Sequence, residues 1–149
     1  MSLNIGSLSI ELIEANIHSD DATVFWIKEL GILLAGDTME DTVTFVAEPQ
    51  NFAIHLADLD RLAALNAKFI LPNHGDPDII ASGGYGSEFI EAQKHYIQTL
   101  VRCRHELGLR EKLLEDLISE PLSMGWVKLF EPYREIHAEN LMRVVAMDK

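Results

Sequence analysis

The chain has 149 residues, of which 48% are hydrophobic and 24% charged. This length and composition allow one sizeable core, so we predict a single domain over residues 1–149. The formal net charge is −12, and 12 Lys and Arg residues are scattered among 24 Asp and Glu residues. Phosphate binding needs clustered basic residues, so the composition argues against a nucleic-acid partner.

Cysteine content and hydropathy bear on the compartment. Cys103 is the single cysteine of the sequence, so no internal disulfide forms and a reducing environment suits the chain. The sequence contains neither a basic-then-apolar leader nor an apolar run long enough to span a bilayer. We therefore predict a cytoplasmic protein that does not interact with membranes.

The first part of the chain, residues 7–80, is predicted to be rich in strands. Near-alternating apolar residues predict a strand over 8–15, and β-branched and aromatic residues predict a hairpin of 23–28 with 31–35. Leucines at helical spacing then predict an amphipathic helix over 52–66. A short buried strand over 69–71 follows and is broken by Pro72.

The second part, residues 86–148, is predicted to be helical. A flexible break at 83–86 precedes a long helix that ends near Gly108. The helical pattern continues over 109–119 and 126–147, around a break at Pro121 and Gly125. The fold class is therefore α+β, with a mostly antiparallel sheet backed by helices and a helical C-terminal region.

Three residues of metal-ligand type each follow a predicted strand: His18, Asp37 and His74. Imidazole nitrogen and carboxylate oxygen are common zinc ligands, and a carboxylate can bridge two ions. Taken singly, each is ordinary, because a histidine in a turn is often solvated and Gly-Asp after a strand is often a turn. Their joint order is what favours a metal site.

This order resembles the metallo-β-lactamase superfamily. The superfamily's later ligands are a His after a strand, a Gly-Asp after a hydrophobic strand, and a His in a Pro-x-His-Gly turn. The matching segments here are Ile17-His18-Ser19, Gly31-Ile32-Leu33-Leu34-Ala35-Gly36-Asp37-Thr38 and Phe69-Ile70-Leu71-Pro72-Asn73-His74-Gly75-Asp76. The resemblance covers residues 8–80 and extends loosely over the helical remainder.

The resemblance implies half of an αββα sandwich, because the superfamily's His-x-His-x-Asp-His cluster is absent from this sequence. His18 would serve one metal, His74 the other, and Asp37 would bridge them, which is too few ligands to close either site. We therefore expect the carboxyl-terminal portion of a site, weakly active or inactive alone. A fragment, a truncated product or a half completed by another chain would each explain the missing cluster.

The implied activity is metal-dependent hydrolysis of an ester, thioester or related bond in a small-molecule substrate that the sequence does not specify. Zinc is the expected metal, with iron or manganese as alternatives. The catalytic role falls to Asp37, which would stabilise the metal-bridging arrangement. Many true β-lactamases of the superfamily have Cys or Ser at this position, so the carboxylate points away from antibiotic hydrolysis.

The resemblance also implies an apolar sheet face that this chain leaves uncovered. We expect either a homodimer, with two copies packed sheet to sheet, or a missing N-terminal half to cover it. One alternative function is a non-catalytic dimerisation or scaffold module in which the ligand positions are relics. Another is an iron-dependent oxidoreductase of the same superfamily.

Several further residues have two interpretations each. We interpret four histidines as surface or partly packed rather than as ligands: His55, His95, His105 and His137. Asp76 and Asp78 are interpreted as caps of a following turn, with support of the metal site as the alternative. The aromatic residues Trp126, Phe130 and Tyr133 are interpreted as core, with pocket lining as the alternative.

Overall fold

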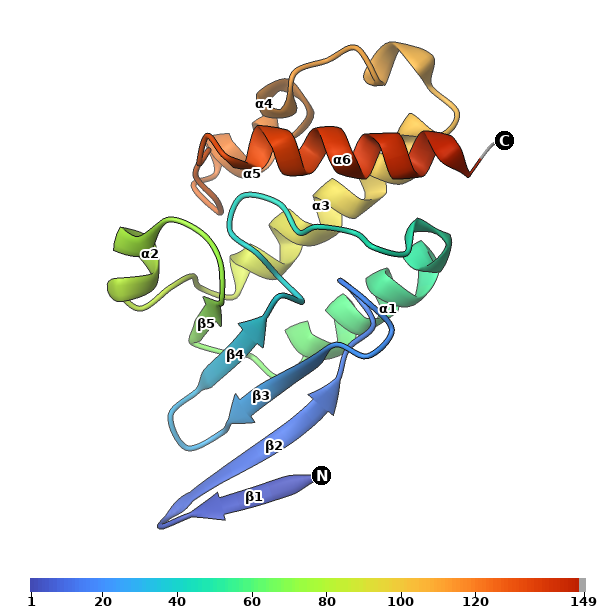
Figure 1. The fold of residues 1–149 in the computed structure, drawn as a ribbon. Coiled ribbons are helices and arrows are strands. Elements are labelled where there is room, and N and C mark those ends of the chain that lie inside the picture. The colour runs from blue at the N-terminus through green and yellow to red at the C-terminus, as the bar shows by residue number, and fades with distance from the viewer. Residues whose placement is uncertain (148–149) are drawn as a thin grey trace.

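A five-stranded sheet forms one layer of the protein and helices form the other (Figure 1), in a computed structural model that describes residues 1–147. The strands lie in the sheet in chain order, as β1 (Ser2–Ile5), β2 (Leu8–Glu14), β3 (Thr23–Ile27), β4 (Ile32–Gly36) and β5 (Phe69–Pro72). Neighbouring strands from β1 to β4 are antiparallel, and β5 pairs parallel to β4. The predicted α+β class with a mostly antiparallel sheet is confirmed.

The helices follow the prediction in the first part of the chain and depart from it in the second. They are α1 (Phe52–Ala63), α2 (Pro77–Ala81), α3 (Glu88–Cys103), α4 (Leu114–Leu117), α5 (Ser119–Ser123) and α6 (Tyr133–Ala146), with 3-10 turns η1 (Pro49–Asn51) and η2 (Leu107–Leu109). The long helix ends at Cys103 instead of Gly108, and much of 109–119 and 126–132 is not helical. Pro121 lies inside α5, because a proline in the first turn of a helix removes no hydrogen bond that the helix needs.

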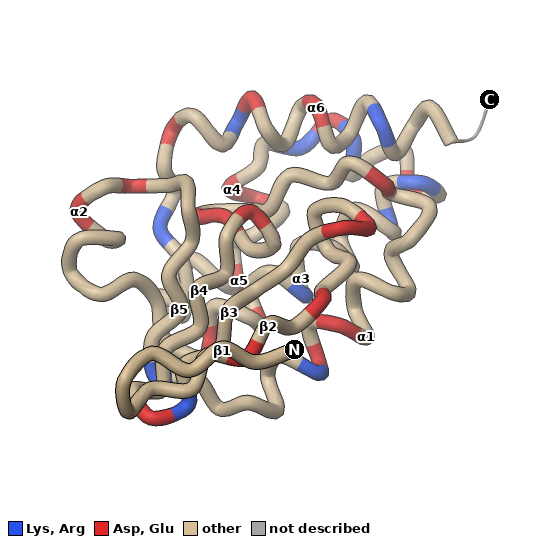
Figure 2. Tube along the Cα trace, turned by 60° about the horizontal axis from the view of Figure 1, so that its bottom comes forward, with Lys and Arg blue, Asp and Glu red and all other residues tan. Residues whose placement is uncertain are grey.

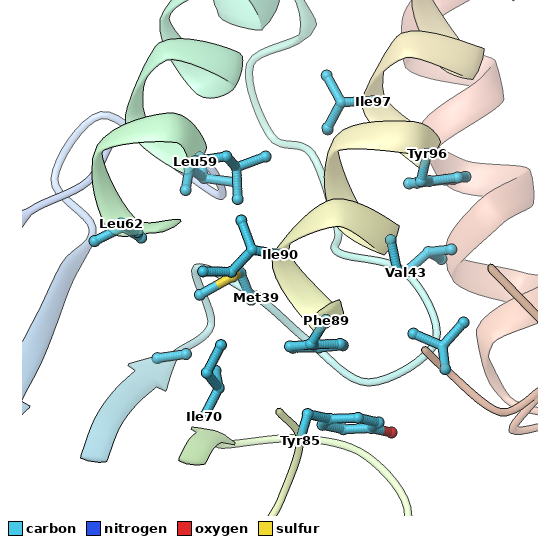
Figure 3. Packing of buried hydrophobic residues seen from close by; sticks show 14 of the residues in the cluster. Met39, Val43, Leu59, Leu62, Ile70, Tyr85, Phe89, Ile90, Tyr96 and Ile97 are labelled. Carbon is cyan, nitrogen blue, oxygen red and sulfur yellow. The ribbon is translucent and has the colours of Figure 1, made fainter. Parts of the chain in front are cut away.

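Helices α1 and α3 cover one face of the sheet. Leu59 and Leu62 of α1 and Phe89 and Ile90 of α3 pack in the same buried cluster as Ile70 of β5 (Figure 3). Helix α3 also packs against α6, so it lies at the centre of the helical layer (Figure 1). The period of apolar residues that predicted α1 and α3 is therefore the period of their buried faces.

The segment after β4 runs through the interior without regular structure. Its buried members are Thr38, Met39, Glu40, Asp41, Thr42, Val43, Thr44 and Val46. Two buried amide side chains bind its backbone: the Gln93 Oε1 accepts from the Thr44 N–H at 2.9 Å, and the Asn140 Oδ1 accepts from the Val46 N–H at 2.8 Å. Buried backbone groups need such partners, so α3 and α6 hold this loop in place.

The glycine-rich segment before α3, predicted as a flexible break, is instead bound to the edge of the sheet. The backbone of Tyr85 exchanges hydrogen bonds of 2.8 and 2.9 Å with that of Ile70 in β5. Gly84 has a φ of +76°, and a Cβ at this position would lie 2.2 Å from the Ile70 carbonyl oxygen. Only glycine allows the backbone to approach the strand this closely.

Asp and Glu residues are spread along the whole chain, over helices, loops and strand ends (Figure 2). They do not gather on one element, and Lys and Arg lie between them. In residues 1–147, no helix is both long and apolar enough to cross a membrane.

Candidate metal site

The strand directions bring the three predicted ligands to one edge of the sheet. Strand β2 is antiparallel to β3, which is antiparallel to β4, so β2, β4 and β5 all run in the same direction. His18 follows β2, Asp37 follows β4 and His74 follows β5. The carboxyl ends of these three strands therefore lie at the same end of the sheet, where ligands from separate parts of the sequence can meet.

Asp37 and His74 lie in contact. The Asp37 Oδ1 is 3.2 Å from the His74 Nε2, and the two side chains are 43% and 66% exposed. Gly36 turns the chain here with a φ of +59°, at a register shift between β4 and β5. The Asn73 N–H donates to the Gly36 carbonyl at 3.0 Å, which joins the two loops behind the pair.

His18 is oriented by an acid that the sequence analysis did not single out. Its Nδ1 lies 3.6 Å from the Glu40 Oε1, and the side chains are 25% and 7% exposed. The Glu40 carboxylate raises the pKa of His18 above its ordinary value against the opposing effect of burial, and Asp37 adds to the rise. An acid within a stretch of apolar and hydroxyl residues, three positions after Asp37, was the available clue to its burial.

The turn that carries His74 is fixed to the buried loop by another acid, Asp41. The Asp41 Oδ2 accepts a hydrogen bond of 2.6 Å from the Asp76 N–H. Gly75 has a φ of +145°, and a Cβ there would lie 2.5 Å from the same oxygen. Asp76 also caps α2 by accepting from the Asp78 N–H at 2.9 Å, as predicted for a capping residue. The Gly75-Asp76 backbone thus sets the position of His74.

Two cavities meet at His18. One, of about 480 Å³, is lined by His18, His74 and Glu40 together with the aromatic residues Phe45, Phe130 and Tyr133. The other, of about 440 Å³, is lined by His18 and Asp37 together with strand residues Phe25 and Leu34. Phe130 and Tyr133 therefore line a cavity, while Tyr133 is also buried against the core.

The donor atoms of His18, Asp37 and His74 meet some, but not all, of the requirements of a metal site. The Asp37 Oδ1 and the His18 Nδ1 are shielded from solvent, and neither makes a hydrogen bond of good geometry to a described residue. Within residues 1–147, however, no three His, Cys, Asp or Glu side chains converge as a metal-holding group. Asp37 and His74 form a pair of donors with His18 nearby, so a closed site needs further ligands.

The remaining histidines lie elsewhere. His55 is fully buried in α1 beside Phe52, which corrects the prediction of a surface or partly packed residue. His137 is also buried, and its Nδ1 lies 3.0 Å from the Tyr96 hydroxyl. His95 lies near the Leu117 carbonyl, with its Nε2 3.1 Å from the oxygen. His105 is exposed. None of the four lines the two cavities at His18.

No protein-family model and no curated protein matches the sequence. Solved structures do share its fold. A metallo-beta-lactamase family protein from Thermus thermophilus superposes with a TM-score of 0.59 at 23% identity, over 99% of this chain and 46% of its own. A beta-lactamase domain protein from Burkholderia ambifaria superposes with a TM-score of 0.50 at 22% identity, over 95% of this chain and 42% of its own.

The chain therefore spans less than half the length of the solved structures that it matches. The fold of this chain is that of part of a metallo-beta-lactamase family protein, as the order of His18, Asp37 and His74 predicted.

Proposed function

We propose that His18, Asp37 and His74 are part of the metal site of a metal-dependent hydrolase of ester, thioester or related bonds. The observation that carries the proposal is the contact between Asp37 and His74, 3.2 Å apart, beside cavities that His18 lines together with each of them. Zinc is the expected metal, and the further ligands come from outside residues 1–147. In this proposal the chain alone is weakly active or inactive.

Each side chain has a distinct task in this site. The Nδ1 of His18 faces Glu40, which leaves its Nε2 as the nitrogen available to a metal. The two oxygens of Asp37 allow it to bind one ion or to bridge two. A metal held by these residues would lower the pKa of a coordinated water toward neutrality and would thereby supply hydroxide for hydrolysis. The aromatic wall of the 480 Å³ cavity offers an apolar surface beside that position.

Zinc titration of the metal-free protein tests the proposal. Because the described residues supply only part of a site, we expect weak zinc binding, and we expect the Asp37→Ala variant to lose it because the variant lacks the carboxylate at the centre of the donor set. Asp20→Ala is the matched control, since Asp20 is an exposed acid in the turn after His18. Equal zinc affinity of the protein and of Asp37→Ala would remove the basis for the proposal.

A non-catalytic dimerisation or scaffold module is the second candidate. It is favoured by one observation, the lack of a converging group of three ligand side chains within residues 1–147. Absence of any zinc binding in that titration, with the fold intact, would select this function. Retention of iron in preference to zinc would instead select the oxidoreductase alternative.

A further inference from the structure

One face of the sheet is built almost entirely of large apolar side chains. Residues directly opposite one another in paired strands point to the same face, so Leu12, Phe25, Leu34 and Leu71 form one row across four strands. A second row passes from Leu3 of β1 to Phe69 of β5. The whole set, which we call the open face, comprises Leu3, Ile5, Leu8, Ile10, Leu12, Glu14, Thr23, Phe25, Ile27, Ile32, Leu34, Phe69 and Leu71.

Most of the open face is left uncovered by residues 1–147, although Gly83 and Gly84 lie beside Phe69 and Leu71 at its β5 side. The alternate residues of the same strands, such as Val24 and Leu33, are fully buried against the helices. By contrast, Phe25 is 37% exposed, Phe69 is 48% exposed, and the others lie between half-buried and exposed. A continuous apolar surface across five strands marks an interaction site in a globular protein.

The candidate metal site opens onto this face. Phe25 and Leu34 of the open face line the same 440 Å³ cavity as His18 and Asp37. A body that covers the open face therefore also lies beside the candidate metal site.

We propose that the open face is the contact between two copies of this chain, packed sheet to sheet about a twofold axis. Apart from Glu14 at the end of β2, its residues carry no side-chain charge, so the central parts of two such faces meet without burying an unpaired charge. Most of the acidic side chains that give the net charge of −12 lie off the open face. This favours a partner surface that is equally apolar over one that depends on charged groups.

The size of the unmatched part of the Thermus thermophilus structure also favours a second copy. The Thermus thermophilus structure is matched over 46% of its chain, so the part of it with no counterpart here is about as large as this chain again. A second copy supplies that mass together with another apolar sheet face of the same shape. It also brings a second set of His18, Asp37 and His74 to the assembly.

Sedimentation velocity of the full chain between about 1 and 100 µM tests the proposal, because weak to moderate interfaces dissociate in this range. We expect a monomer–dimer equilibrium, and a monomer at all concentrations for the double variant Phe25→Asp with Phe69→Asp. Leu107→Asp is the control, since Leu107 is 69% exposed and lies in η2, outside the open face. A monomeric wild type, or a dimer that persists in the double variant, would overturn the proposal.

A footprinting measurement needs no variant and covers the case in which the double variant fails to fold. Hydroxyl-radical oxidation of Phe25 and Phe69 should fall as the concentration of the wild type rises, while oxidation of Met142, 66% exposed on α6, stays constant. Unchanged oxidation of Phe25 and Phe69 in the dimer would place the contact elsewhere and overturn the proposal. Both experiments are run in EDTA, so dimerisation is judged separately from metal binding.

Discussion

Glu40 is nearly buried, and its carboxylate faces the Nδ1 of His18. A carboxylate in this position favours the tautomer that carries its proton on Nδ1. Replacing it with an amide of the same shape weakens that preference. Glu40 therefore positions His18 without itself reaching the cavity shared with Asp37.

In a Glu40→Gln variant, we expect the neutral His18 ring to change from mainly the Nδ1–H tautomer to a mixture of the two tautomers. Two-bond proton–nitrogen NMR spectra of the metal-free protein report this directly. Glu48→Gln is the control, since Glu48 lies in the same connecting segment but its carboxylate faces Asn51. An identical His18 spectrum in Glu40→Gln and the wild type would show that Glu40 does not position the ring.

His55 makes the stability of the fold depend on pH. The side chain is fully buried, and neither ring nitrogen has a hydrogen-bond partner among the described residues. Burial lowers the pKa of His55 from 6.5 to about 4. The folded state therefore binds fewer protons than the unfolded state between these values, so stability falls as the pH drops from about 6.5 to 4 and levels off below.

The lowered pKa corresponds to a loss of about 3 kcal/mol of unfolding free energy across this window. Urea denaturation at several pH values measures the loss, and the His55→Leu variant should lack most of it. NMR titration of the wild type is a direct check, because the His55 ring signals should stay at their neutral positions down to about pH 5. A His55 midpoint near its ordinary value of about 6.5 would contradict the expectation.

At the scale of elements, regular apolar patterns made most of the fold predictable. Strands β3 to β5 and helices α1 and α3 each bury one side, which leaves a period in the sequence. The apolar alternation that predicted β2 lies instead on the open face. Strand β1 was missed because all four of its residues are exposed and its only support is pairing with β2. Elements stabilised by pairing alone leave no such period.

The buried loop after β4 could not be predicted for a different reason. Its interior position depends on hydrogen bonds from Gln93 and Asn140, which lie 49 and 94 residues away from their partners Thr44 and Val46. Polar residues in an irregular segment indicate a surface loop when read locally. The same loop holds Glu40, so the missed burial and the missed site residue have one cause.

Asn140 should be among the most sensitive positions outside the apolar core. Its side chain accepts from the Val46 N–H and donates to the Thr44 carbonyl and the Tyr96 hydroxyl, at 2.8, 2.8 and 3.0 Å. Asn140→Ala leaves these buried groups unpaired and should lower the unfolding free energy by roughly 3 kcal/mol. Urea denaturation measures the change, with Glu139→Ala on the exposed side of α6 as control. If Asn140→Ala lowered the unfolding free energy no more than Glu139→Ala, water would be making the hydrogen bonds of the Asn140 amide in the variant.

At the scale of the whole molecule, the order of three ligand-type residues predicted a metal site, and the strand directions bring these residues to the same end of the sheet. The sequence could predict that His18, Asp37 and His74 follow strands, because each stands after an apolar segment. It could not predict the contact of Asp37 with His74, which depends on the parallel pairing of β4 with β5. Pairing between strands this far apart along the chain is a property of the assembled sheet.

The net charge of −12 should make the protein more stable in salt. Acidic side chains repel one another across the surface, and salt screens this repulsion over a Debye length of about 10 Å at about 0.1 M. We expect the midpoint of thermal unfolding to rise by a few degrees between about 0.02 and 0.3 M NaCl, measured at fixed protein concentration. Choline chloride, as a second salt, should give the same rise. A fall in both salts would show that attractive ion pairs outweigh the repulsion.

The two edge strands of the sheet, β1 and β5, differ in how readily a strand from another molecule can pair with them. On the β5 side, Tyr85 already occupies backbone groups of Ile70, while β1 on the opposite side has no neighbour among residues 1–147. A strand from another molecule can therefore extend the sheet readily only at β1. Growth from one end stops after a single addition, so extension of this sheet gives pairs of molecules and not fibrils.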